Sequence, residues 1–331
     1  MTNAPKKRVL SGMQPSGLMH LGNYLGALEN WKLLQEQHDC FFFVADWHAL
    51  STNYADTSRL KEFVRELLID WFAAGIDPKR STVFIQSHIP EHAVLHLLFS
   101  MMIPVSWLER NPTYKEKQEE IKEKDLSTYG FLGYPVLQAA DILLYKPDFV
   151  PVGKDQLPHL ELTREVARRF NDIYKKPVFP EPKEYLTKFP KVLGTDGRKM
   201  SKSYGNTINL SDTEPVVRQK LKTMVTDPAR VRRTDPGNPE VCPVYEFHKI
   251  YSPQAVQDQI NTDCRTAAIG CIDCKKQVAD KMVERMAPMW DARAALTSTP
   301  SRIDEIIHDG SERAAKVAKT TLAEVNEAMK I

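Results

Sequence analysis

The first half of the chain alternates short apolar runs with longer segments in which apolar residues recur at helical spacing. Residues 40–45 form an unbroken apolar run of strand length, preceded by a shorter run at residues 9–10 and followed by a third at 82–86. Such runs are typical of parallel strands covered on both faces. Residues 60–72 place large apolar side chains on one helix face, and Gly75 ends that pattern. This half therefore predicts a βαβαβ unit.

The alternation breaks near Pro90, where helical patterns begin that end in the charged run 114–120. The sheet is expected to resume at residues 149–152, with a helix after it at 157–170. Four prolines between residues 177 and 190 then predict an extended connection.

After about residue 209 the pattern is helical to the end of the chain. We therefore expect an α/β fold with a Rossmann-type, doubly wound parallel sheet over residues 1–208, including a helical insertion at about 90–130. Residues 209–331 are expected to form an all-helical C-terminal domain.

Composition and charge narrow the partners. The 331 residues are 42% hydrophobic and 27% charged, which is ordinary for a soluble protein with one large domain or two. The net charge of +2 excludes a global attraction for nucleic acid, so any RNA contact needs a local basic patch. One candidate segment contains Arg218, Lys220, Lys222, Arg230, Arg232 and Arg233.

The chain has no run that would suit a membrane span or a signal core, because the apolar run after Lys6 and Lys7 is too short. A cytoplasmic location and no membrane partner are expected. The five cysteines should then be thiols or metal ligands and not disulfides.

Two polar loops are suited to binding phosphate. The turn Ser11–Gly17, with His20 and Asn23 after it, follows a strand and precedes a helix, so backbone N–H groups converge there. Far downstream, Lys199-Met200-Ser201-Lys202-Ser203 follows a turn at Asp196-Gly197. Two lysines in a polar loop are suited to gripping the pyrophosphate that leaves from ATP.

Asp141 is a carboxylate in an apolar helical segment at residues 137–144, where an unpaired charge would be costly. A buried ion pair, a solvent-facing position and a ligand contact are the possibilities. His48, after a strand end, could line a pocket or be a core residue with a satisfied ring.

Four of the five cysteines, Cys242, Cys264, Cys271 and Cys274, lie within 33 residues. Four thiolates with a two-residue final gap suit a tetrahedral zinc or a [4Fe–4S] cluster, and sequence does not separate the two. Four unrelated buried thiols are the alternative.

The two loops, in this order, resemble the signatures of class I aminoacyl-tRNA synthetases. The chain is most similar to bacterial-type tryptophanyl-tRNA synthetases, and the resemblance runs from about Val9 to the last helix. The motifs that carry it are Gly12–Gly17 with Gly22-Asn23-Tyr24, Asp46–Ala49, Ala139–Tyr145, Val150–Gln156 and Lys199–Ser203.

The resemblance implies ATP-dependent activation of L-tryptophan to tryptophanyl-adenylate, with Mg²⁺, and its transfer to tRNA(Trp) by a homodimer. Lys199, Lys202, Gln14 and His20 would be catalytic. The implied ATP-binding residues are Gln14, Pro15, Ser16, Gly22, Asn23, Lys117, Gly153, Lys154, Asp155, Val192, Lys199, Met200, Ser201, Lys202 and Ser203.

The resemblance also implies a tryptophan site in which Asp141 accepts a hydrogen bond from the indole N–H. The site residues would be Asp141, Gln138, Tyr134, His48, Val150, Val152, Gln156 and Leu10. A subset of the family carries an iron–sulfur cluster on a similar four-cysteine motif, which favours the cluster here.

Two residues depart from the family pattern. Gln138 stands where the family usually has a methionine, and a glutamine at this position is similar to the pattern of the tyrosyl-tRNA synthetases. Lys154 stands where an acidic residue is common. A tyrosyl-type synthetase and a non-charging, RNA-binding paralogue therefore remain alternatives to the tryptophan enzyme.

Overall fold

The computed structural model describes residues 6–111, 127–153, 156–186 and 192–331. Five parallel strands form one sheet in the order β3-β2-β1-β4-β5. The strands are β1 (Arg8–Met13), β2 (Asp39–Val44), β3 (Ser81–Ile85), β4 (Phe149–Val152) and β5 (Lys183–Leu186). The predicted α/β class and parallel sheet are confirmed.

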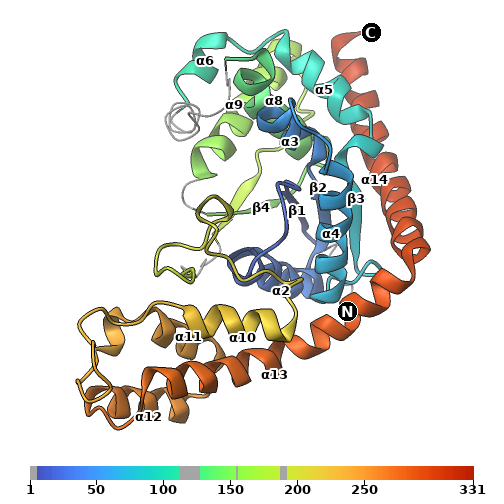
Figure 1. Ribbon diagram of the computed structural model, residues 1–331. Helices are drawn as coiled ribbons and strands as arrows, with labels where there is room; N and C mark the ends of the chain where they lie inside the picture. The colour runs from blue at the N-terminus through green and yellow to red at the C-terminus, as the bar shows by residue number, and fades with distance from the viewer. Residues whose placement is uncertain (1–5, 112–126, 154–155, 187–191) are drawn as a thin grey trace, which may run out of the picture.

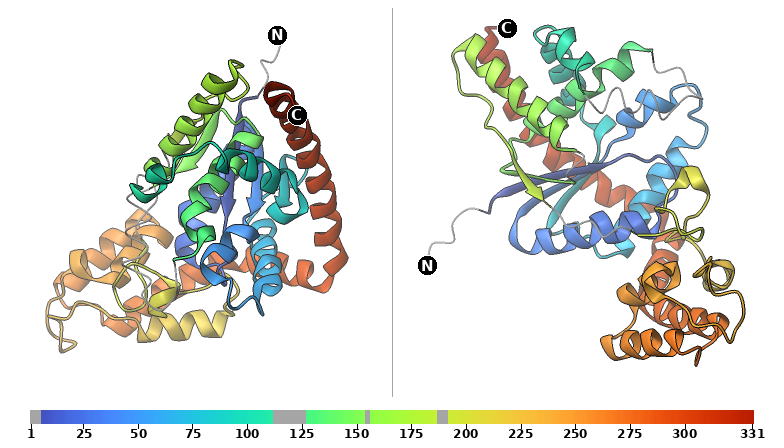
Figure 2. Two further views of the ribbon diagram at one scale, coloured as in Figure 1. Left: turned by 90° about the horizontal axis from the view of Figure 1, so that it is seen from above. Right: turned by 90° about the vertical axis from the view of Figure 1, so that its left-hand side faces the viewer.

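Helices cover both faces of this sheet (Figure 2). Along β2, Phe42 and Val44 pack into one apolar core, whereas Phe41 and Phe43 pack into the other. Because successive side chains of a strand point to opposite faces, a strand buried on both sides must be apolar throughout. The unbroken apolar run in the sequence has this origin.

The helices before the C-terminal part surround the sheet (Figure 1). They are α1 (Leu21–Asn23), α2 (Glu29–Gln37), α3 (Asp46–Asn53), α4 (Leu60–Ala73), α5 (Glu91–Ser100), α6 (Val105–Glu109), α8 (Tyr129–Leu144) and α9 (Leu157–Tyr174). A π-helical segment, Tyr24–Leu28, joins α1 to α2. Gly75 adopts φ +103° directly after α4, a conformation that favours glycine and ends the helix there.

The remaining helices are α10 (Glu214–Thr223), α11 (Pro243–Tyr251), α12 (Gln254–Arg265), α13 (Cys271–Ser298) and α14 (Pro300–Met329). Helices α10 to α13 extend away from the sheet, while α14 turns back along it (Figure 1). At Gly310 of α14 an added Cβ would come within 1.8 Å of the Val83 carbonyl oxygen. The last helix therefore packs directly on β3, and it also contacts α5.

The prolines from residue 177 onward predict an extended connection. The structure adds that part of it, β5, pairs with β4 at the sheet edge. All four β5 residues are exposed, so the strand lacks the apolar pattern from which a buried strand is recognised.

Candidate functional site

The site lies at the topological switch point of the sheet, where the chain connections leave β1 toward opposite sides. From the central strand β1 the chain moves to β2 on one side and later to β4 on the other. In open α/β sheets, ligands bind at the carboxyl ends of the strands that flank this point. A cavity of about 300 Å³ opens there, with Gly12 to Gln14 of the β1 end and Pro151 to Gly153 of the β4 end in its wall.

All eight side chains expected to hold the amino acid line this one cavity. They are Leu10, His48, Tyr134, Gln138, Asp141, Val150, Val152 and Gln156. They come from two strands, from α3 and α8, and from the residue that precedes α9. The sequence did not indicate Asn30, Trp31 or His159, which also line it.

Asp141 is 1% exposed and lies in a network of buried polar side chains. His48 Nε2 lies 2.7 Å from its Oδ2, and His92 Nδ1 lies 2.6 Å from its Oδ1. The Gln86 amide donates to both oxygens, at 2.8 and 2.9 Å. Burial tends to raise the pKa of Asp141, but the charges and hydrogen bonds of His48 and His92 outweigh it and lower that pKa to about 2.

The carboxylate is therefore ionised, paired and part of the cavity wall. Sequence reasoning missed Gln86, which begins the 3₁₀ turn directly after β3, and His92 at the start of α5. It also missed Tyr145, whose hydroxyl lies 2.9 Å from His92 Nε2. Polar residues next to the apolar run of β3 were a signal, but nothing local connected them to Asp141.

The β1–α1 turn forms the neighbouring part of the site. Gln14 lines the cavity, and Pro15 and Ser16 line an adjoining hollow beside α3 and α4. His20 precedes α1, and its backbone N–H donates to Asn23 Oδ1 at 3.3 Å. Burial, and then the charge of Lys202, lower the pKa of His20 to about 4, so the ring is neutral at pH 7.

Two glycines beside this turn, Gly12 of β1 and Gly22 of α1, are packed closely within the protein. An added Cβ at Gly12 would lie 2.5 Å from the Phe43 ring, and one at Gly22 would lie 2.9 Å from the His20 ring. Close approach of a nucleotide to the backbone is therefore not needed to explain them.

The loop that carries Lys199 and Lys202, here called the lysine loop, folds against this turn. Val192, which precedes the loop, and Met200, which lies within it, are both 4% exposed and pack into the core. Lys202 Nζ donates to the Gly17 carbonyl oxygen at 3.0 Å and lies 3.4 Å from Ser16 Oγ. Although the Lys202 side chain is exposed overall, desolvation of its ammonium group lowers its pKa to about 8, with the charge of Asp70 opposing that shift.

Ser201 precedes the short 3₁₀ turn Lys202–Tyr204, which includes Ser203. The backbone of Lys199 forms an antiparallel bridge with that of Leu193. The structure thus brings together the two predicted loops, since the contact between Lys202 and Gly17 joins residues 185 positions apart in the sequence. Lys117, Lys154 and Asp155 lie outside the described residues.

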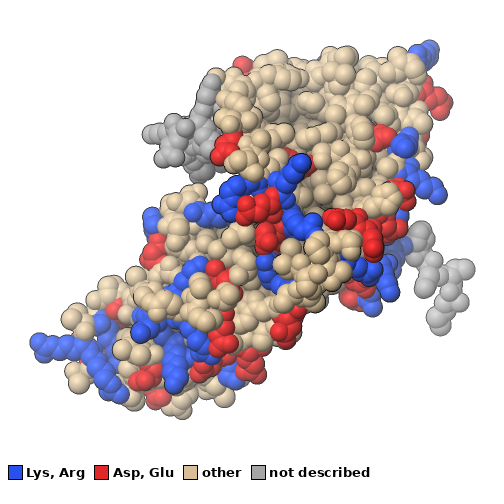
Figure 3. Space-filling model, turned by 45° about the vertical axis from the view of Figure 1, so that its right-hand side comes forward, with Lys and Arg blue, Asp and Glu red and all other residues tan. Residues whose placement is uncertain are grey.

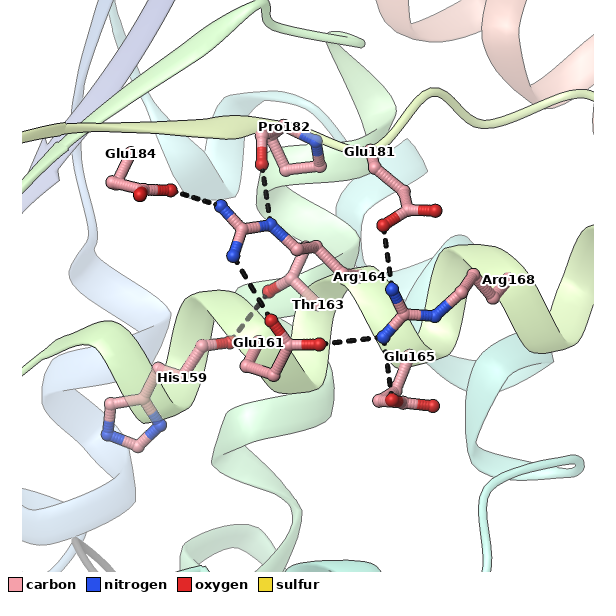
Figure 4. A network of polar contacts seen from close by, with 9 residues as sticks. All are labelled: His159, Glu161, Thr163, Arg164, Glu165, Arg168, Glu181, Pro182 and Glu184. Atoms are coloured by element: carbon pink, nitrogen blue, oxygen red, sulfur yellow. Dashed lines mark hydrogen bonds and ion pairs between the residues drawn. The ribbon is translucent and has the colours of Figure 1, made fainter.

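Helix α9, which forms the far wall, is fixed to the sheet edge by arginines (Figure 4). Arg164 donates to the Pro182 carbonyl oxygen at 2.9 Å and to Glu184 of β5 at 2.5 Å. One turn later, Arg168 donates to Glu181 at 2.7 Å. These contacts hold the helix whose first turns place Gln156 and His159 in the cavity.

The four clustered cysteines gather at the ends of α11, α12 and α13. Burial, and then the neighbouring Cys242, Cys264 and Cys271, raise the pKa of Cys274 to about 12, against the opposing charge of Arg230. Within the described residues, however, no three His, Cys, Asp or Glu side chains are arranged to hold a metal ion. The predicted metal site is therefore not confirmed.

The basic segment at residues 218–233 is less free than its sequence suggested. Arg218 pairs with Glu214 and Asp280, and Lys220 pairs with Asp212. Arg230 is 8% exposed and donates to the Ile269 carbonyl oxygen at 2.7 Å.

Lys222, Arg232 and Arg233 of this segment are exposed. In Figure 3, acidic and basic side chains are interspersed over the lower part of the molecule, where α10 to α13 lie. No helix in the described ranges is long and apolar enough to cross a membrane.

Comparison with known proteins gives a consistent result. A family model for class I tRNA synthetases of the tryptophan and tyrosine type matches residues 2–287. The chain is 54% identical to the tryptophan–tRNA ligase of Thermotoga maritima over 98% of this chain and 99% of that one. It is 42% identical to that of Deinococcus radiodurans, covering 97% of each.

Among solved structures, tryptophanyl-tRNA synthetase from Campylobacter jejuni complexed with ADP and tryptophan matches with a TM-score of 0.90 and 32% identity, covering 98% of this chain and 100% of that one. A tyrosyl-tRNA synthetase from Archaeoglobus fulgidus matches at 22% identity and a TM-score of 0.65, over 87% of this chain and 90% of that one, which shows a shared fold alone.

Proposed function

The chain belongs to the class I tRNA synthetases of the tryptophan and tyrosine family, and from this membership we propose how its cavity performs the reaction. The activity is that of a tryptophan–tRNA ligase: ATP-dependent activation of L-tryptophan, then transfer to tRNA(Trp). The tyrosyl-type and non-charging alternatives are set aside by the identity to tryptophan enzymes over the whole chain.

The observation that supports the proposed site is the convergence of eight expected side chains on one cavity at the sheet's switch point. The test is ATP–pyrophosphate exchange with each of the twenty amino acids. Tryptophan alone should drive exchange; equal exchange with tyrosine would refute the proposed selectivity, and none with tryptophan would refute the function.

Asp141 would select tryptophan through the indole N–H, which can only donate. A buried acceptor that needs this donor discriminates against phenylalanine, because the acceptor would lose a hydrogen bond. His48 lines the cavity and contacts Asp141 Oδ2, so it would lie close to the same indole N–H. Gln138 and Tyr134, one turn apart on α8, would contact the rest of the amino acid.

ATP would bind beside the amino acid, on the β1–α1 turn and the lysine loop. The substrate carboxylate attacks the α-phosphorus and pyrophosphate leaves, so the protein contributes mainly position and charge. Lys202 and Lys199 would stabilise the charge on the leaving group, while Gln14 and the neutral His20 would hold phosphate or ribose oxygens.

The other ATP-binding residues proposed are Pro15, Ser16, Gly22, Asn23, Lys117, Gly153, Lys154, Asp155, Val192, Met200, Ser201 and Ser203. Mg²⁺, when bound with ATP, supplies further positive charge at the phosphates.

The division into a catalytic domain over residues 1–208 and a helical, anticodon-binding domain over 209–331 is proposed on the same basis. Helix α14 would fasten the two parts together, because it follows α13 and packs on β3. The exposed Arg232 and Arg233 are the proposed RNA contacts of the basic segment.

A homodimer is also proposed, and an apolar face on α5 supports it. Val94, Leu97 and Met101 recur at helical spacing and are 41%, 55% and 71% exposed, and Val105 of α6 is 55% exposed. Large apolar side chains gathered on one face of a protein are typical of an interaction surface. A second copy of the chain would bury this face.

For the four cysteines we propose a bound metal, with an iron–sulfur cluster preferred over zinc. The proposal is supported by the gathering of four thiols from three helix ends and by the softness of sulfur ligands. The metal would tie these helix ends together and has no part in adenylate formation. A cytoplasmic location is proposed because tRNA charging takes place where translation does.

A further inference from the structure

Asn206 follows the lysine loop, and its side chain is hydrogen-bonded to three points of that loop. The residue is 2% exposed. Its Oδ1 accepts from the Ser201 backbone N–H at 2.8 Å. Its Nδ2 donates to Asp196 Oδ1 at 2.7 Å and to the Lys199 carbonyl oxygen at 3.2 Å.

The backbone and the neighbours of Asn206 support the same arrangement. Its carbonyl oxygen accepts from the Thr195 N–H at 3.0 Å. At Gly194 an added Cβ would lie 2.3 Å from the Asn206 amide, so only glycine leaves room for it. The hydrogen bond from Asn206 also lowers the pKa of Asp196, which in turn accepts from the Arg198 N–H at 3.0 Å.

These contacts lie before and between the two lysines. The Lys199 carbonyl and the Ser201 N–H flank Met200, and Ser201 directly precedes Lys202. The buried Asn206 amide therefore accepts one hydrogen bond and donates two. Together these bonds fix the conformation of the loop from which both lysines extend. Serine, alanine or aspartate could not supply the same three contacts.

We propose that Asn206 is a positioning residue for adenylate formation, which holds Lys199 and Lys202 at the site of the leaving pyrophosphate. It touches no substrate and acts through the two lysines. The proposal rests on the function proposed above for those lysines.

The test is a double-mutant cycle on pyrophosphate exchange with Asn206→Ala, Lys202→Ala and the double variant. Asn206→Ala should lower kcat about tenfold or more and leave the KM for tryptophan within about twofold. In the Lys202→Ala background the same change should cost much less, because residues that act as one unit are not additive. Tyr204→Leu, which removes the ring stacked on Arg198, is a matched loop control and should keep kcat.

A donor–acceptor exchange keeps the test decisive if Asn206→Ala folds poorly. Asn206→Asp places two carboxylates together and should lower kcat, whereas adding Asp196→Asn returns a donor between the two side chains and should recover part of it. The proposal would be overturned if the effects of Asn206→Ala and Lys202→Ala on kcat were fully additive. It would also be overturned if adding Asp196→Asn to Asn206→Asp recovered no kcat. Wild-type rates in Lys202→Ala would instead refute the role of the lysine.

Discussion

Replacing Asp141 with asparagine tests the centre of the proposed site with almost no change in volume. The carboxylate accepts four contacts, from His48, His92 and twice from Gln86. An asparagine NH₂ group would face donors at one of these positions, so the network loses its acceptor there. The charge that pairs with the two histidines is lost as well.

The magnitude follows from the loss of hydrogen bonds to a buried charged group, about 1.5–3 kcal/mol for each one lost. Because the indole contact and one internal contact are affected, we expect about 3–6 kcal/mol in activation of tryptophan. At about 1.4 kcal/mol per tenfold, kcat/KM for tryptophan should fall by about 100- to 20,000-fold. The KM for ATP should stay within about twofold, since Asp141 belongs to the amino-acid end of the cavity.

The assay is ATP–pyrophosphate exchange at varied tryptophan, with thermal unfolding in parallel. Tyr145→Phe is the matched control, because it removes only the hydroxyl beyond His92 and should cost less than about tenfold. A loss of less than about threefold in kcat/KM for Asp141→Asn would refute the assigned role. An equal loss for ATP would mean that the network supports the whole cavity and does not select the indole.

The pKa of Asp141 gives this network a pH dependence of known sign. In the folded protein that pKa is about 2, below the value of 3.8 taken for the free side chain. The stabilising contribution of the ionised carboxylate is thus complete above about pH 4 and is lost as the pH falls toward about 2. The free energy of unfolding of Asp141→Asn, measured by denaturant unfolding at a series of pH values, should depend less on pH over this window than that of the wild type.

Lys202→Ala should lower the rate of adenylate formation more than ATP binding, because its partner charge develops on the leaving group; equal losses in single-turnover kinetics would contradict this. Cys271→Ser should remove bound iron from protein purified without oxygen, lower thermal stability and keep exchange activity; about one zinc per chain would reject the cluster, and no metal in the wild type would reject the site. Leu97→Glu should shift the protein to monomer in light scattering, and an unchanged mass would exclude the α5 face. Arg293→Met should cost about 3–5 kcal/mol in unfolding free energy, since it leaves the buried Asp70 without its cation; pairing it with Asp70→Asn should recover part of that loss, and additive losses would contradict the ion pair.

The sequence by itself determined the elements whose signal is local. The apolar run of β2 and the helical spacing of α4 predicted both correctly, because burial on one or two faces fixes the side-chain pattern directly. The resemblance to the tryptophan enzymes implied a set of eight residues, and all eight line one cavity. Their role in holding the amino acid stays a prediction.

Only the tertiary structure decided the contacts between segments far apart in sequence. Gln86 and His92 complete the surroundings of Asp141 from 55 and 49 residues away. Arg230 was expected on a basic surface but is buried, because the Ile269 carbonyl oxygen accepts a hydrogen bond from its side chain. Helix α14 returned to β3, and β5 formed at an exposed edge without an apolar pattern.

The physical reason is the same in each case. An apolar periodicity records that a residue is buried, but not what it is buried against. A polar side chain is satisfied by whichever partner the fold brings within hydrogen-bond distance, and that partner leaves no mark in the local sequence. The chain therefore specified its strands, helices and site motifs locally, while the fold decided how Asp141, Lys202 and Asn206 are held.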